Sequence, residues 1–198
     1  MNIAVLTFDG FNELDSFIAA GILNRMTPHG WNVQICSPSE RVTSMNGVTI
    51  EAQQPLEFAN QADVVLFGSG IYTRDIAHDE QVLSRLKLSP ETQLIGGQCS
   101  GTLLMSVLGL LHDIPACTDL TTKPWVMESG VTVLEQAFYA RGNIATAGGC
   151  LASEYLAAWV IAKLAGTEQA RVALHYTAPV GEKEQRVNHG LSVVCAYL

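Results

Sequence analysis

The sequence has few positively charged residues. Its 198 residues include 11 Lys and Arg against 19 Asp and Glu, which gives a formal net charge of −8 at pH 7. Proteins that bind nucleic acid or anionic membranes usually carry a basic cluster that attracts phosphate groups. No such cluster occurs along this chain. We therefore expect neither nucleic acid nor a membrane surface among the partners of this protein.

The sequence also has no long hydrophobic run and no regular cysteine pattern. No uninterrupted apolar segment approaches the roughly 20 residues that span a bilayer. Residues 1–10 have neither the basic segment nor the apolar core of a secretion signal. The five cysteines are irregularly spaced, with no C-x-x-C pair, so we expect neither a disulfide framework nor a zinc site. Together these absences favour a cytoplasmic location, where thiols stay reduced.

What the chain does contain is an alternation of strand-like and helix-like segments. Apolar runs, several of which end at or near a glycine, predict strands at 2–8, 31–37, 46–52, 62–68, 93–98, 131–136, 137–142 and 143–148. Helical spacing of apolar residues predicts helices at 12–26, 79–88, 100–111, 150–164 and 167–175. This rhythm is typical of an α/β sandwich with a mostly parallel sheet covered on both faces. We expect residues 1–198 to form a single domain.

One short stretch carries the clearest chemical signal. Residues 97–101 read Gly-Gln-Cys-Ser-Gly and lie between the predicted strand 93–98 and the predicted helix 100–111. A nucleophile between two glycines at such a junction is typical of a nucleophile elbow, which exposes the side chain at the sheet edge where ligands bind. A helix N-terminus lowers the pKa of a cysteine there. We therefore predict that Cys99 is a nucleophile.

The competing interpretation is that Cys99 is a small buried hydrophobic residue, as free cysteines often are. That interpretation is the better one for Cys36 and Cys117, which stand in apolar, strand-like runs. The position of Cys99 between a strand and a helix favours the nucleophile. Cys150 opens a predicted helix after two glycines, and we expect it in the core, with the alternative that it faces the site as a second thiol.

Four segments resemble the ThiJ/PfpI branch of the class I glutamine amidotransferase-like superfamily. They read VLTFDGFNELD, ADVVLFGSG, GGQCSGTLLMSVLGLLHD and ARGNIATAGGCLASEYLAAWVIAKLAG, and the resemblance covers nearly the whole chain. Within that branch, the sequence is most similar to isonitrile hydratase-like proteins. The resemblance implies a flavodoxin-like three-layer sandwich and a homodimer.

The resemblance also assigns the site. It places Asp15 beside Cys99, where an acid and a thiol so close would share a proton. It keeps a hydroxyl at Ser100, next to the nucleophile. Gly70 would supply a backbone N–H that pairs with the N–H of Ser100 to bind an oxyanion. A histidine that many members of the family use is missing, because the matching stretch reads ACTDLTTKPW and has Asp119.

An acid and a thiol without a histidine are suited to isonitrile hydration, which yields an N-substituted formamide. The catalytic residues would be Cys99, Asp15 and Ser100, the substrate would be a small molecule, and no metal or organic cofactor is implied. Two alternatives stay open. One is glyoxalase or deglycase chemistry on small dicarbonyls, which usually needs a histidine. The other is a non-catalytic redox or ligand sensor that uses Cys99.

Overall fold

The centre of the molecule is a seven-stranded sheet in the order β5-β2-β1-β6-β7-β9-β8. In this computed structural model, which describes all residues from 1 to 198, every strand pair is parallel except β8 with β9. The strands are β1 (Asn2–Leu6), β2 (Asn32–Ser37), β5 (Gln54–Pro55), β6 (Val64–Phe67), β7 (Leu94–Gln98), β8 (Phe138–Arg141) and β9 (Ile144–Ala147). The predicted α/β fold with a mostly parallel sheet is confirmed.

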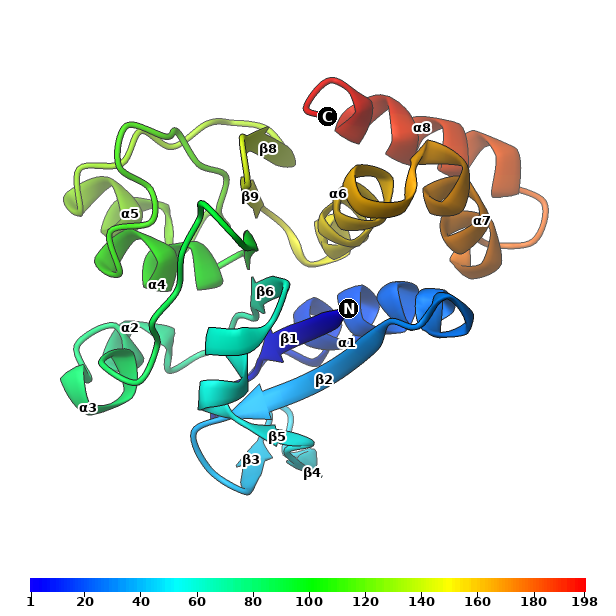
Figure 1. The fold of residues 1–198 in the computed structure, drawn as a ribbon. Helices are drawn as coiled ribbons and strands as arrows, with labels where there is room; N and C mark the ends of the chain where they lie inside the picture. The colour runs from blue at the N-terminus through cyan, green and yellow to red at the C-terminus, as the bar shows by residue number, and fades with distance from the viewer.

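Helices cover both faces of the sheet (Figure 1). One layer holds α1 (Glu13–Leu23), α6 (Ser153–Ala165), α7 (Thr167–Thr177) and α8 (Lys183–Cys195). The other holds α2 (Thr73–Ile76), α3 (Glu80–Leu83), α4 (Gly101–Val107) and α5 (Lys123–Glu128). Short 3₁₀ helices are η1 (Asn24–His29), η2 (Leu56–Gln61) and η3 (Cys150–Ala152). A separate antiparallel pair consists of β3 (Arg41–Thr43) and β4 (Thr49–Glu51).

The apolar character of the strands follows from this layering. Ile3 and Val5 of β1 belong to the core beneath α1 and α6, whereas Ala4 and Leu6 belong to the core beneath α4. Successive side chains of a strand point to opposite faces, so a strand covered on both sides is apolar at every position. This is why the strand signal in the sequence is a continuous apolar run.

The junction of β7 and α4 is the predicted nucleophile elbow. β7 ends at Gln98, α4 begins at Gly101, and Cys99 has a left-handed backbone with φ 48°. A Cβ atom on Gly101 would lie 2.5 Å from the carbonyl oxygen of Phe67, and one on Gly97 would lie 2.5 Å from the sulfur of Met105. Glycine at both positions lets the helix approach the strands, and the turn directs Cys99 to the sheet edge.

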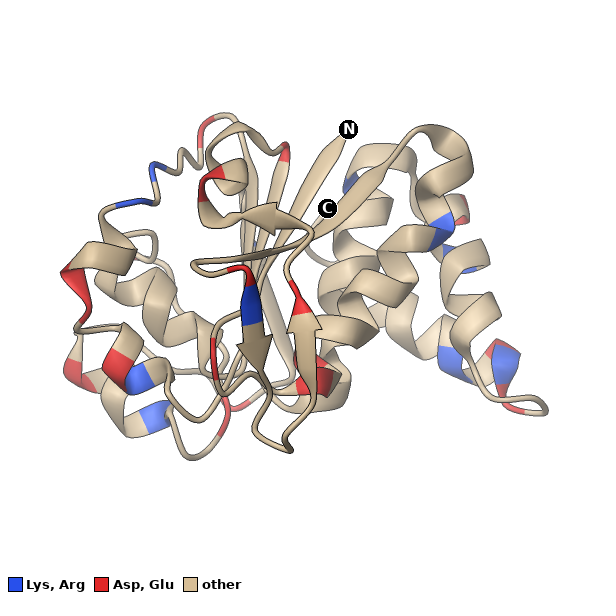
Figure 2. Ribbon diagram, turned by 90° about the horizontal axis from the view of Figure 1, so that it is seen from below, with Lys and Arg blue, Asp and Glu red and all other residues tan.

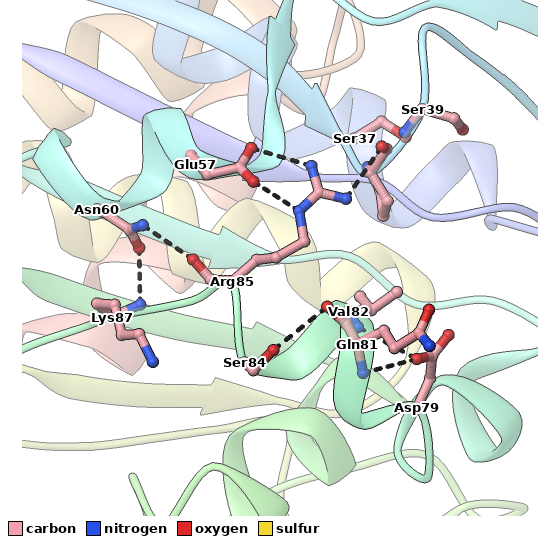
Figure 3. Close-up of polar contacts among 11 residues, drawn as sticks. Ser37, Ser39, Glu57, Asn60, Asp79, Gln81, Val82, Ser84, Arg85 and Lys87 are labelled. Atoms are coloured by element: carbon pink, nitrogen blue, oxygen red, sulfur yellow. Dashed lines mark hydrogen bonds and ion pairs between the residues drawn. The ribbon is translucent and has the colours of Figure 1, made fainter.

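The prediction of a helix over 79–88 is wrong in its second half, because the helix ends at Leu83. The side chain of Asn60 donates to the carbonyl of Arg85 and accepts from the N–H of Lys87, at 2.9 and 2.7 Å. The guanidinium of Arg85 donates to both carboxylate oxygens of Glu57, at 2.6 and 2.9 Å (Figure 3). These contacts with η2 replace the backbone hydrogen bonds of a longer helix.

The prediction of a strand over 131–136 is also wrong, since only Val133 forms an isolated bridge, with Ala116. Six regular elements were not predicted, namely β3, β5, η2, α2, α5 and α8. The charged and polar residues of α8 outnumber its apolar ones, and α5 has Pro124 in its first turn. Both lie near the end of a layer, where a helix needs only a narrow apolar stripe.

Charged residues are spread over separate elements on both sides of the sheet (Figure 2). Lys and Arg residues occur singly or in pairs in η1, β3, α2, α5, β8, α6, α7 and α8 and in the loop after α3. No helix combines the length and the apolar composition needed to cross a bilayer.

We expect Gly101→Ala to destabilise the protein and to displace the elbow, because the new methyl group would overlap the carbonyl oxygens of Phe67 and Gly68. Overpacking of this kind costs about 1–3 kcal/mol, measurable by urea unfolding. Gly21→Ala is the matched control, since nothing lies within 4 Å of its Cβ position inside α1. Equal stability of both variants would contradict the close approach of α4.

Candidate active site

A pocket of about 390 Å³ lies where β1, β6 and β7 end. Because these strands are parallel, their C-terminal ends meet at one edge of the sheet, the usual place for a ligand in this architecture. The pocket is lined by Asn12, Asp15, Met45, Ser69, Gly70, Ile71, Cys99, Ser100, Asp119, Thr121, Thr122, Trp125 and Cys150. The structure thus brings together all four residues that the sequence predicted for the site, namely Asp15, Gly70, Cys99 and Ser100.

Cys99 is held firmly at the base of this pocket, with only 4% of its surface exposed. Its N–H donates to the carbonyl of Ala147 at 2.8 Å, and its own carbonyl accepts from the hydroxyl of Thr118 at 2.7 Å. The side-chain amide of Gln98 donates to the Cys99 sulfur at 3.4 Å. The backbone of the nucleophile is therefore fixed from both neighbouring segments.

Asp15 reaches the same point from the first turn of α1 and is 2% exposed. The helix is capped by Asn12, whose side chain accepts from the N–H of Leu14 at 3.1 Å. Oδ2 of Asp15 accepts a hydrogen bond from the Ser69 hydroxyl, and Oδ1 is buried without a partner. A carboxylate oxygen of Asp15 and the sulfurs of Cys99 and Cys150 all lie within 4.8 Å of one another.

Burial raises the pKa of the Cys99 thiol, and the adjacent charge of Asp15 raises it further. This corrects the expectation of a lowered thiol pKa, because the sulfur is buried and burial disfavours the charged thiolate. Burial also raises the pKa of Asp15, although hydrogen bonds from Ser69 and Cys99 oppose that change. Both groups resist ionisation, so at neutral pH the pair holds at least one proton in common.

Ser100 and Gly70 contact each other. The N–H of Gly70 donates to the Ser100 hydroxyl oxygen at 3.1 Å, and the Thr73 hydroxyl lies 2.8 Å from the same oxygen. The Gly70 N–H, which the sequence assigned to an oxyanion, is thus occupied by the Ser100 side chain. The N–H of Ser100 itself donates no hydrogen bond within the chain. The arrangement offers one free backbone donor and a firmly oriented hydroxyl.

Sequence reasoning missed or undervalued several pocket residues. Cys150 lines the pocket, half-buried, and its sulfur accepts from the Asn12 side chain at 3.2 Å, so the expected core position is wrong. Asp119 accepts from the N–H groups of Thr121 and Thr122, both at 2.9 Å, and so stabilises the turn that brings Trp125 to the pocket. An Asp two residues before a pair of Thr residues is a turn signal that could have indicated this.

No histidine serves the pocket. All five are exposed, and none belongs to its lining: His29, His78, His112, His175 and His189. Asp15, Cys99 and Cys150 are the one group of three metal-ligating side chains in the chain. The chemistry available at the site is therefore that of a thiol, a second thiol and a carboxyl group.

Comparison with known proteins agrees with this fold. Residues 1–163 match the model of the DJ-1/PfpI family. The fold is similar to that of DJ-1 from Schizosaccharomyces pombe, with 16% identity, a TM-score of 0.76, and coverage of 90% of this chain and 100% of that one. A DJ-1 superfamily protein from Salmonella typhimurium gives 21% identity and a TM-score of 0.76, over 90% of this chain and 98% of that one.

A ThiJ/PfpI family protein from Pseudomonas syringae is similar over 98% of this chain and 87% of its own, with 18% identity and a TM-score of 0.74. At these identities the likeness concerns the fold. No protein of curated function matches the sequence significantly.

We expect Asp15→Asn to stabilise the protein at neutral pH but not in acid. Below about pH 4, the usual carboxyl pKa, Asp15 is protonated in both the folded and the unfolded chain. As the pH rises, the unfolded chain loses its proton first, because burial raises the pKa of Asp15 in the folded chain. The free energy of unfolding of the parent therefore falls as the pH rises over this range, whereas that of the asparagine variant does not.

The measurement is urea unfolding at a series of pH values from acid to neutral. Glu91→Gln serves as the control, because Glu91 is exposed and forms no ion pair. A gain for Asp15→Asn that is the same at every pH would show that desolvation of the carboxylate is not its cause.

Proposed function

The chain belongs to the DJ-1/PfpI family, and we propose that it is a cysteine-dependent enzyme that hydrates a small isonitrile to an N-substituted formamide. The observation that supports this proposal most is the contact of Cys99 with Asp15 in a pocket that no histidine lines. Isonitrile hydration requires a nucleophile and an acid at one carbon atom. It does not require an imidazole that shuttles protons, as amide cleavage does.

The shared proton accounts for the first step. An isonitrile binds with its terminal carbon next to the Cys99 sulfur, and Asp15 delivers a proton to that carbon. The sulfur attacks the same carbon, which forms a carbon–sulfur bond and leaves a thioimidate on Cys99. Because the pair gives up its proton as the substrate gains one, the thiolate forms only when the electrophile is in place.

The second step uses the carboxylate that remains. Ionised Asp15 accepts a proton from a water molecule, whose oxygen attacks the thioimidate carbon. The carbon–sulfur bond breaks, the sulfur recovers the proton that Asp15 took from the water, the second hydrogen of that water moves from oxygen to nitrogen, and the product leaves as the formamide. The Ser100 hydroxyl, which Gly70 and Thr73 contact at 3.1 and 2.8 Å, would position this water. In the net reaction, one isonitrile and one water molecule give one formamide.

The pocket also favours a particular kind of substrate. Its volume of about 390 Å³ admits a small molecule. Met45, Ile71 and Trp125 supply an apolar wall, which would accommodate the substituent on the isonitrile nitrogen. Dicarbonyl chemistry, the alternative enzyme function, finds less support, since the histidine it usually uses has no counterpart here.

We expect Asp15→Asn to lower turnover of a small alkyl isonitrile by about 10²–10⁴-fold, the usual contribution of general acid–base catalysis. Asparagine keeps the size and a hydrogen-bond donor but transfers no proton. Formamide production measures turnover, with Cys99→Ala as the inactive reference and Asp75→Asn, at an exposed position of α2, as the control. Parental turnover by Asp15→Asn would exclude the mechanism, and turnover of methylglyoxal alone would favour dicarbonyl chemistry.

A second prediction distinguishes the contribution of the Ser100 hydroxyl from that of the Ser100 backbone N–H. We expect Ser100→Ala to fold and to form the thioimidate, yet to release product more slowly, because the hydroxyl acts on water and not on sulfur. Mass spectrometry of the enzyme during turnover should then show an adduct on Cys99 that accumulates in the variant. If the variant released product as fast as the parent, the hydroxyl would have no part in the reaction.

A further inference from the structure

Two neighbouring strands bring a second thiol to the nucleophile. β7 and β9 are parallel, with Gln98 paired to Ala147 at their ends. Cys99 is the first residue after β7, and Cys150 is the third residue after β9. The sulfur atoms therefore lie within 4.8 Å of each other, although the two cysteines are 51 positions apart in the sequence. No step of the proposed hydration uses Cys150.

The segments that carry the two cysteines are joined by one side chain. The amide of Gln98 donates to the Cys99 sulfur at 3.4 Å and to the carbonyl of Gly149 at 2.8 Å. The carbonyl oxygen of the same side chain is buried without a partner. Gln98 thus connects Cys99 to the turn just before Cys150. These two hydrogen bonds fix the two cysteine segments relative to each other.

Polar groups lie against both sulfurs. The side-chain amide of Asn12 donates to the Cys150 sulfur at 3.2 Å. A carboxylate oxygen of Asp15 lies within 4.8 Å of both sulfurs. Burial and Asp15 raise the pKa of Cys150, although the hydrogen bond from Asn12 opposes that change. A disulfide requires the sulfurs to close to about 2.05 Å. Gly149 has φ 94° and open space around it, so the Cys150 turn has room to adjust.

We propose that Cys99 and Cys150 form a reversible disulfide on reaction with a small hydroperoxide. The Cys99 sulfur attacks the terminal oxygen of the peroxide, the oxygen–oxygen bond breaks, and an alcohol or water leaves with the proton shared with Asp15. The resulting Cys99 sulfenic acid is attacked by the Cys150 sulfur. The sulfur–oxygen bond breaks, the Cys150 proton leaves with the oxygen as water, and the disulfide forms. An external dithiol returns both thiols by exchange.

The other three cysteines cannot take this role. Cys36 and Cys117 are fully buried in the core, and Cys195 is exposed at the end of α8. None of them lines the pocket. Oxidation of the folded protein by a stoichiometric amount of peroxide should therefore join Cys99 to Cys150. Three thiols, those of Cys36, Cys117 and Cys195, should remain open to alkylation in denaturant.

The test is peroxide treatment of the native protein, followed by alkylation in denaturant and peptide mapping by mass spectrometry. We expect a linked pair of peptides that contain Cys99 and Cys150, a loss of two hydrogens from the intact mass, and full recovery of both thiols with dithiothreitol. In Cys150→Ser, the linked pair should be lost and Cys99 should gain two oxygen atoms as the irreversible sulfinate. Cys195→Ser, the control, should form the same linked pair as the parent.

Mapping of the parent protein tests the proposal even if Cys150→Ser folds poorly, and Cys150→Ala provides a second variant. A Cys99 sulfinate in the parent with Cys150 still free to alkylate would overturn the proposal. A linkage through Cys195 alone, or a linked pair that dithiothreitol does not reduce, would also overturn it. None of these results depends on isonitrile turnover, so failure of the hydration mechanism is recognised separately.

Discussion

The close approach of α4 to the ends of β6 and β7 is the constraint on which the site depends. Gly97 and Gly101 have no Cβ, and any larger residue would overlap Met105 or the carbonyl of Phe67. With the helix so close, the chain between strand and helix has two residues in which to turn, and Cys99 takes a left-handed backbone. Hydrogen bonds to Ala147 and Thr118 hold that conformation. The position of the Cys99 sulfur is therefore fixed by the strands and the helix that hold its backbone.

A buried acid beside a buried thiol follows from this geometry. α1 begins where β1 ends, so its first turn places Asp15 at the same edge of the sheet as the elbow. Both groups are almost fully buried, and burial raises the pKa of each. A permanently ionised thiol would be costly here, because two adjacent negative charges would be buried together. The pair retains a proton instead, which is the proton that the proposed hydration would deliver to its substrate.

Much of this arrangement was predictable from the sequence, for identifiable reasons. The strands are buried on both faces, so their apolar runs are continuous, and the elbow has glycines at fixed spacing around one cysteine. Asp15 came from a family resemblance, because a single acid in a first turn is also a common surface residue. The extent of α3 was not predictable, since Asn60 and Glu57 take the groups that would extend it. The pocket position of Cys150 was stated only as the alternative to a core position, because it depends on strand order, which no local pattern records.

The proximity of the two thiols also bears on how the resting protein avoids damage. Desolvation keeps the Cys99 sulfur protonated, and a thiol reacts far more slowly with oxidants than a thiolate does. The same desolvation leaves any sulfenic acid formed there out of contact with bulk thiols, because Cys99 is 4% exposed. A resolving thiol must then come from within the pocket, and Cys150 is the one other cysteine that lines it. The proposed hydration and the proposed disulfide formation would thus depend on the same property, a buried Cys99 sulfur next to Asp15 that would lose its proton only when a small electrophile enters the pocket.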